Sequence, residues 1–252
     1  MAATPQGALL TAQHRAQQIQ LRVVTVRDLL KVWRIFDPKA ISESWDTLEP
    51  ALVALIQSRR VTSAALTAEY LRAFGLAEIG AAPASVQASV LPADEIIPNL
   101  RLLGPANAWD LTRKGRTAAE VARTTLTMVA GEVTRQTLNG GRRTLTDTVS
   151  RDRRIRGYTR VTDGSPCAFC AMVAGRGPVY RSEQTASFEA HLKCGCTGEP
   201  VYASDAPWSP SAQRYRDMYD QASRAVPSSV PKSDRGAAVR REFRRLYEAS
   251  NG

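Results

Sequence analysis

All four cysteines of the 252-residue chain, and one of its two histidines, lie within one window of 30 residues. The window opens with Cys167-Ala-Phe-Cys170 and closes, after 20 intervening residues, with His191-Leu-Lys-Cys194-Gly-Cys196. A CxxC turn directs two thiolates towards one point, and a second turn with sulfur and imidazole donors completes a tetrahedral site that holds zinc. The pattern therefore predicts a bound Zn²⁺, with Cys167, Cys170, His191, Cys194 and Cys196 as candidate ligands.

Five donors compete for the four positions of such a site. Cys167 and Cys170 belong to it if it exists. His191 and Cys194 have the HxxC spacing that suits one ion, but Cys196 could replace Cys194. In an extended strand Cys194 and Cys196 would point to the same side, because side chains alternate with a period of two. Both could then reach the metal and leave His191 outside it, so the spacing alone does not choose the four ligands.

Three other chemistries could use the same residues. Disulfide pairing requires an oxidising compartment, which nothing in the sequence indicates. A thioredoxin-type redox CxxC requires a strand before it and a long helix after it, and that context is missing. A catalytic zinc requires a general base; Glu189 and Glu199 are the nearby carboxylates, yet neither an HExxH nor an HxE…PCxxC pattern is present. A structural zinc is favoured over these three alternatives.

The composition of residues 157–203 gives a mechanical reason for a metal. This stretch contains few large apolar side chains, chiefly Phe169, Met172 and Phe188 with some Val and Tyr. So small a unit cannot bury enough surface to fold alone, and a metal crosslink substitutes for the missing core. Short β-type runs near 158–162, 177–181 and 200–202 surround the cysteines.

The rest of the chain is predicted to be helical, which makes the fold class α+β and mostly α-helical. We expect a helical N-terminal region (1–156), a zinc-stapled β-containing module (157–203) and basic C-terminal helices (204–252). Apolar residues at helical spacing predict a first helix over 1–36, with a core-facing stripe formed by Ile19, Val23, Val26, Leu30 and Trp33.

Proline and glycine suggest where the later helices end. A break is expected at Asp37-Pro38, with separate helical segments following from Trp45 and around Leu66–Phe74, the last ending at Gly75 or Gly80. A Pro/Ala-rich connector with at most short turns is expected at 81–105. Further helices are predicted at 106–138, stopped by Asn139-Gly140-Gly141, at 145–155, after Ser209-Pro210, and after a link at 227–233.

The net charge of +10 is confined to residues 101–252, since residues 1–100 contain equal numbers of acidic and basic side chains. The densest basic segment predicts a surface for nucleic acid or an acidic partner; a solvated helix face and codon bias are the alternatives. Aromatic residues for base stacking are scarce, so contact with phosphates is expected without sequence specificity. The seven arginines of this segment are Arg142, Arg143, Arg151, Arg153, Arg154, Arg156 and Arg160.

Neither a membrane protein nor a classically secreted protein is expected. The longest uninterrupted aliphatic run, 51–56, is far shorter than the roughly 20 residues of a membrane-spanning helix. The N-terminal residues show no basic stretch followed by an apolar one, so no secretory signal is visible.

The cysteine segment resembles the MuF-like minor head proteins of tailed bacteriophages. The similarity covers Arg156-Gly-Tyr-Thr-Arg-Val, Asp163-Gly-Ser-Pro-Cys167-Ala-Phe-Cys170 and the strand Gly177-Pro-Val-Tyr180, and it ends in His191-Leu-Lys-Cys194-Gly-Cys196 before Pro200-Val-Tyr. Order and spacing agree over about 45 residues. Leu192-Lys193 departs from the family, which often has Pro and Asn there.

This resemblance implies a structural minor capsid protein that is not an enzyme. Its expected partners are the phage portal protein and the capsid shell, with packaged double-stranded DNA as a non-specific contact. Its expected location is the virion, inside the head near the portal, after assembly in the host cytoplasm, with an effect on DNA packaging or ejection. The alternative is a DNA-binding or regulatory zinc module, which would select particular DNA sequences.

Overall fold

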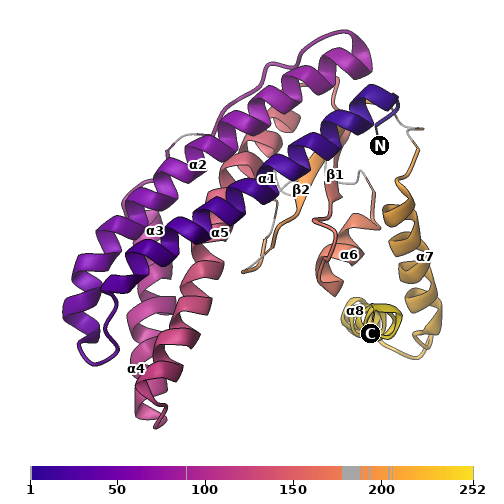
Figure 1. The fold of residues 1–252 in the computed structure, drawn as a ribbon. Coiled ribbons are helices and arrows are strands. Elements are labelled where there is room, and N and C mark those ends of the chain that lie inside the picture. The colour runs from indigo at the N-terminus through magenta and orange to yellow at the C-terminus, as the bar shows by residue number, and fades with distance from the viewer. Residues whose placement is uncertain are drawn as a thin grey trace.

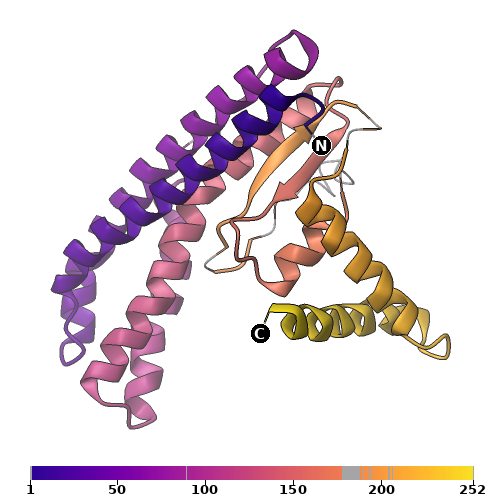
Figure 2. The same cartoon turned by 45° about the vertical axis from the view of Figure 1, so that its right-hand side comes forward.

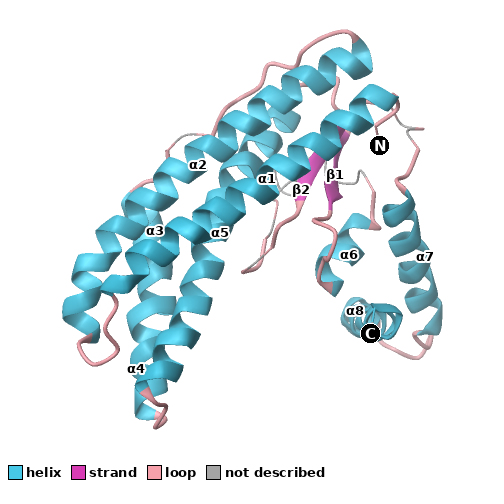
Figure 3. Ribbon diagram, in the orientation of Figure 1, coloured by secondary structure: helices cyan, strands magenta, loops and turns pink. Residues whose placement is uncertain are grey.

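Three long helices lie side by side and form the main body of the molecule (Figure 1). They are α1 (Pro5–Val32), α2 (Ile41–Ile79) and α5 (Ala118–Arg151). The computed structural model describes residues 2–88, 90–177, 188, 190–192, 194–203, 205 and 207–251. Within them the protein is mostly helical with one small sheet, which confirms the predicted α+β class (Figure 3).

Helix α2 is one continuous helix where the sequence predicts separate segments. It continues through Pro50, although a proline inside a helix removes a backbone hydrogen bond and costs about 3 kcal/mol. Leu48, Leu52 and Ile56 are fully buried on either side of this position, and their burial offsets that cost. The helix ends at Gly80, whose φ of 68° is the left-handed conformation that favours glycine, so this predicted end is confirmed.

Helix α5 continues through the predicted stop at Asn139-Gly140-Gly141, so that prediction is wrong. The two glycines serve helix packing instead of helix termination. A Cβ on Gly140 would lie 2.2 Å from the carbonyl oxygen of Arg60, and one on Gly141 would lie 2.4 Å from Oγ1 of Thr67. Because both neighbours belong to α2, the glycines allow α2 and α5 to approach closely. The shorter helix predicted near residues 145–155 is the last part of α5.

The predicted connector is also partly helical. Residues 81–92 contain no helix, but the chain from residue 93 onwards forms two short helices around a π-helical turn. Ile96 and Leu100 are fully buried against the core, and this burial stabilises a helix despite Pro98. The three pieces are α3 (Ala93–Arg101), the π-helical turn (Leu102–Ala106) and α4 (Asn107–Arg113).

Helix α1 buries a different face from the predicted one. Val23 and Leu30 of the predicted stripe are 55% and 49% exposed, whereas Trp33 is buried. The buried face of α1 is largely polar, and it consists of Gly7, Thr11, His14, Gln18, Leu21, Thr25 and Leu29.

Hydrogen bonds to α2 explain this choice of face. The side chain of Ser63 donates to Oε1 of Gln18 at 2.8 Å, and Nε2 of Gln18 donates to the Ser63 carbonyl at 3.2 Å. Nε2 of His14 lies 3.0 Å from Oγ1 of Thr67, and the imidazole stacks on the ring of Tyr70. Polar groups that pair across a buried contact avoid the cost of desolvation, so α1 does not need its apolar stripe to dock.

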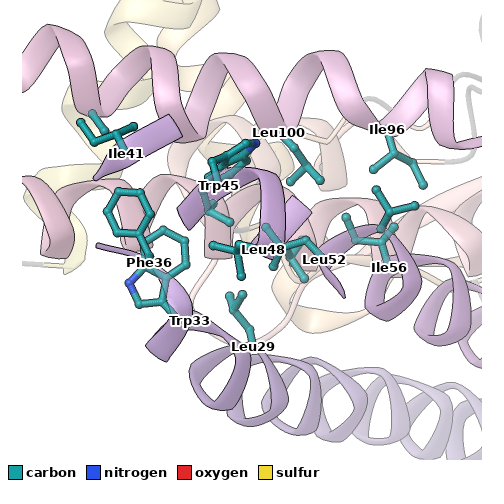
Figure 4. Packing of buried hydrophobic residues seen from close by; sticks show 14 of the residues in the cluster. Leu29, Trp33, Phe36, Ile41, Trp45, Leu48, Leu52, Ile56, Ile96 and Leu100 are labelled. Carbon is teal, nitrogen blue, oxygen red and sulfur yellow. The ribbon is translucent and has the colours of Figure 1, made fainter. Parts of the chain in front are cut away.

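An apolar core fills the end of the bundle that lies away from the sheet (Figure 4). Trp33, Phe36 and Trp45 contact one another there, with ring centroids 4.7 and 6.5 Å apart along the series. Aliphatic side chains complete the cluster, among them Leu29, Leu48, Leu52, Ile56, Ile96 and Leu100.

The sheet has two antiparallel strands, β1 (Gly157–Val161) and β2 (Thr197–Val201), with Gly157 opposite Val201. It lies against α5, where Gly198 of β2 leaves room for Leu145: a Cβ on this glycine would lie 2.1 Å from that side chain. Two of the three predicted β runs correspond to these strands. The third, at 177–181, falls after Gly177 outside the described residues.

The C-terminal helices form a separate layer with α6 (Ala168–Ala174) (Figure 2). α7 (Pro210–Ala225) begins as predicted, because Ser209 accepts a hydrogen bond from the Ala212 N–H and Pro210 occupies the first turn. Tyr215 of α7 and Phe243 of α8 (Lys232–Asn251) are buried in this layer.

The predicted domain divisions at residues 157 and 204 stay predictions. None of the described helices combines the length and apolarity that a membrane span requires.

Candidate metal centre

The two halves of the cysteine motif are held by different elements that meet near β1. Cys167 caps α6: its Sγ accepts the backbone N–H of Cys170 at 3.4 Å, which places both sulfurs at the first turn. The second half is a tight turn, in which the N–H of Cys194 donates to the carbonyl of His191 at 3.2 Å. Cys196 directly precedes β2, so the sheet fixes the second half relative to the first.

The structure brings all five predicted donors together. They form two overlapping trios, Cys167 with Cys170 and His191, and Cys170 with Cys194 and Cys196, in each of which the donor atoms lie within 4.8 Å of one another. Nε2 of His191 is 2.7 Å from Sγ of Cys167, and Sγ of Cys170 is 3.5 Å from Sγ of Cys194. Cys170 therefore links the trios, and the cluster can bind a metal ion.

Burial and hydrogen bonding prepare these groups for coordination. Cys170, Cys194 and Cys196 are buried free thiols, whereas Cys167 and His191 lie at the surface. Nδ1 of His191 lies 2.8 Å from the carbonyl of Leu192, and this contact turns Nε2 towards the sulfurs. A backbone partner on the second ring nitrogen is typical of histidines that bind metals.

Close packing of the thiols separates their pKa values. The side chain and then the backbone N–H of Cys170 lower the pKa of Cys167 to about 5, with a further contribution from His191. Hydrogen bonding with Cys170 also lowers the pKa of Cys194, while the pKa of Cys170 is raised by its contacts with Cys167 and then Cys194. Because the thiolate is the ligand form of cysteine, the lowered pKa values of Cys167 and Cys194 suit these two sulfurs for coordination.

Two of the seven predicted surface arginines are buried beside this cluster. The guanidinium of Arg142, on α5, donates to the carbonyls of Cys194 at 2.7 Å and Cys196 at 3.0 Å. Nη1 of Arg160, on β1, lies 3.9 Å from Sγ of Cys170 and 4.0 Å from Sγ of Cys194. The prediction of an external contact surface therefore does not hold for these two residues, whose positive charges face the sulfurs and the turn that carries them.

An aromatic side chain that the sequence did not single out completes the surroundings. The ring of Phe188 lies 4.0 Å from the guanidinium carbon of Arg160 and 5.1 Å from that of Arg142, and it stacks on Tyr158. Cations over a ring face are attracted to it. The available sequence signal was that Phe188 is one of the few large apolar residues in 157–203, so it has few other places to pack.

The other five arginines of the basic segment are exposed and point in several directions. Arg143 pairs with Asp147, and Arg154 pairs with Asp152 and donates to the carbonyl of Ala82. The guanidinium of Arg156 donates to the carbonyl of Tyr202. Contact of these residues, which include Arg151 and Arg153, with nucleic acid or an acidic partner stays a prediction.

The two carboxylates near the motif differ in position. Glu199 is buried on β2 and faces a hollow of about 330 Å³ that Thr11, Arg15 and Trp208 also line, and burial raises its pKa. Glu189 lies outside the described residues.

The fold and the site together define a mostly helical α+β protein with a compact Cys/His cluster of the kind that holds a metal. Residues 8–222 match the family model described as VG15 protein. Because the match spans most of the chain, this chain belongs to the VG15 protein family, a phage-type viral family. Comparisons with curated proteins and with solved structures gave no match. The sequence-based assignment to a phage is thus supported at the level of a viral protein.

Proposed function

We propose that this chain is a structural minor capsid protein of a tailed phage, which associates with the portal inside the head and affects DNA packaging or ejection. The observation that carries the proposal is the five-donor cluster at the junction of sheet and bundle, in a chain that belongs to a phage-type family. The more specific role, association with the portal inside the head, is proposed because the cysteine segment resembles MuF-like minor head proteins. The basic half of the chain suits a protein beside packaged DNA, a dense polyanion.

In this proposal the metal is a structural Zn²⁺. Sulfur and imidazole donors suit zinc better than cations that prefer oxygen, and five such donors are close enough to supply four ligands. The ion would be held by Cys170 with a subset of Cys167, His191, Cys194 and Cys196, and it would join the turn before β2 to the cap of α6. Arg142 would then connect the turn before β2 to α5, because its guanidinium donates hydrogen bonds to the carbonyls of Cys194 and Cys196.

Purified heads test the structural role. We expect mass spectrometry to detect the chain in heads and in complexes isolated through a tagged portal protein, at a copy number well below that of the shell protein. Absence from heads, in cells that express the chain, would overturn the proposal. Elemental analysis of the purified chain tests the metal separately, with about one zinc per chain expected for a single four-ligand site.

DNA binding separates this role from that of a regulatory zinc module. A structural head protein would bind DNA weakly, without sequence preference, and less as salt rises. A regulatory module would prefer one sequence over random DNA by about a thousandfold or more. In this chain, two of the seven arginines predicted to contact DNA are buried at the cluster, which favours the structural role.

A further inference from the structure

The apolar stripe of α1 that the bundle does not use borders a groove between α1 and α5. The groove has a volume of about 300 Å³, and we define it by Val26, Leu29 and Leu30 of α1 with Leu126, Ala130 and Gly131 of α5. The two helices lie at an angle to each other, as Figure 2 shows. Val23, one turn before Val26 on the same side, is 55% exposed and extends the apolar surface.

The floor and walls of the groove suit an inserted aliphatic side chain. On α5, Ala130 and Gly131 are small, so the backbone of a partner could approach closely beside Leu126. On α1, Leu30 is 49% exposed and stands at the edge, where a bound side chain would cover it. Large aliphatic groups gain free energy when they leave water, and exposed apolar patches bordered by polar residues mark interaction sites.

The border of the groove is basic. At 100° per residue, Arg27 lies beyond Val23 and Leu30 on α1, and Arg123 lies on the groove face of α5 two turns before Ala130. Arg34 lies in the 3-10 turn Trp33–Ile35 that directly follows α1. Arg27, Arg34 and Arg123 are all exposed. Arg22 also lines the groove, but it pairs with Asp163.

Acidic side chains do not balance this border. Asp28 is the single acidic residue of α1, and Lys31 and Arg59 bind it at 2.9 and 2.6 Å, with Arg27 at 3.8 Å. In the first half of α5, Glu132 is buried and bound to Arg135, and Glu120, one turn before Arg123, pairs with Arg116, so the cations still outnumber the acids. The groove therefore presents an apolar centre within positive charge.

We infer that the groove binds an acidic amphipathic helix of a partner protein. Leucine-type side chains at i, i+3 and i+7 would enter the groove, and flanking carboxylates would meet Arg27, Arg34 and Arg123. A second copy of this chain is a poor occupant, because each copy carries a net charge of +10. DNA is opposite in charge to the basic border, but it offers no apolar side chains for the centre of the groove. The inference specifies the chemistry of the partner and rests on the proposed function only in placing that partner in the phage head.

A binding assay with defined peptides tests the inference on the full chain. The probe is a fluorescein-labelled peptide of about three heptads with leucine on one face and glutamate elsewhere. Two controls replace every glutamate by lysine or every leucine by serine. We expect saturable binding of the first peptide, followed by fluorescence anisotropy, and at least about tenfold weaker binding of both controls.

Paired variants locate the site. Ala130→Trp fills the groove and should weaken binding about tenfold or more, whereas Ala249→Trp on the exposed side of α8 should leave it unchanged. Arg123→Glu should weaken binding about threefold at low salt, while Arg113→Glu on α4 serves as its matched control. Unchanged circular dichroism of each variant excludes misfolding as the cause.

Several outcomes would overturn the inference. These are equal binding of the acidic and basic peptides, full binding by Ala130→Trp, displacement of the peptide by random DNA, or a dimer by light scattering that Leu30→Glu dissolves. Absence of the chain from phage heads would instead contradict the proposed function alone, because the peptide assay does not depend on it.

Discussion

The helical bundle and the cysteine module are held together in different ways. The bundle is stabilised by contacts among its own side chains, with tryptophans and leucines packed at one end and a polar hydrogen-bond network at the other. In the module, the buried cluster around the donors consists of Cys170, Cys194 and Cys196 with a few aromatic neighbours, and α6 is buried against α7 and α8. One region thus has the buried surface of a folding unit, while the other gathers the donors for a crosslink. Substitutions, chelation and acid should therefore affect the two regions differently.

Loss of the proposed metal should have the largest effect, because it should unfold the cysteine module and leave the helical bundle folded. We expect Cys170→Ser, which removes the sulfur shared by both trios, to abolish zinc binding and the folding free energy of about 10 kcal/mol that a structural zinc contributes. Hydrogen exchange should then lose protection in β1 and β2 but keep it in α2 around Leu52. Chelation should have the same effect, and added Zn²⁺ should reverse it. Intact protection of both strands without metal would show that the module folds by itself.

Lowering the pH should destabilise the bundle, because unfolding lets His14 take up a proton. Burial lowers the pKa of this imidazole from 6.5 to about 3, so the folded state keeps it neutral. The unfolded chain takes up the proton at the higher pH, so this contribution is complete above pH 6.5 and is lost as the pH falls towards 3. The full loss amounts to about 5 kcal/mol, from 1.36 kcal/mol per pKa unit.

Urea denaturation as a function of pH measures this loss, with His14→Gln as the comparison. The variant cannot take up that proton, so its stability should fall less between pH 6.5 and pH 4 than that of the unchanged chain. Parallel curves for the two proteins would contradict the assignment to His14.

The close contact of α2 and α5 should not tolerate a methyl group. Gly141→Ala would place a Cβ 2.4 Å from Oγ1 of Thr67, and we expect a loss of about 3 kcal/mol. The same substitution at Gly236 on α8 meets only the end of Arg240, at 3.6 Å. Because alanine favours helix formation over glycine, Gly236→Ala should stabilise its helix by up to about 1 kcal/mol. Thermal melting of both variants checks the opposite signs.

Arg142 is expected to couple the two regions. Arg142→Met leaves the carbonyls of Cys194 and Cys196 without their donor, and we expect a loss of about 2 kcal/mol. Its neighbour Arg143 is exposed and pairs only with Asp147, so Arg143→Met should cost less than about 0.5 kcal/mol. Urea midpoints compare the two. Equal effects would mean that the hydrogen bonds of Arg142 do not join α5 to the module.

Part of the fold follows from local sequence. The Ser209-Pro210 cap, the end of α2 at Gly80 and two of the β runs are set by residues within one turn of the feature. The grouping of donors within each half, Cys167 with Cys170 and His191 with Cys194 and Cys196, also follows from spacing, because a short turn limits how far such residues can separate. These features need no knowledge of distant neighbours, which is why the sequence was sufficient to predict them.

The remaining features depend on partners far along the chain. Gly140 and Gly141 look like a helix stop, yet α2 approaches there and makes them a packing contact. The stripe of α1 looks like a core face, but hydrogen bonds to Ser63 and Thr67 bury its polar side instead. Arg142 looks like a surface charge until the carbonyls before β2 come within reach. Local residue patterns are therefore enough to place a helix start, the short strands and the candidate metal donors. Which faces become buried follows from the folded arrangement, since burial depends on what lies opposite.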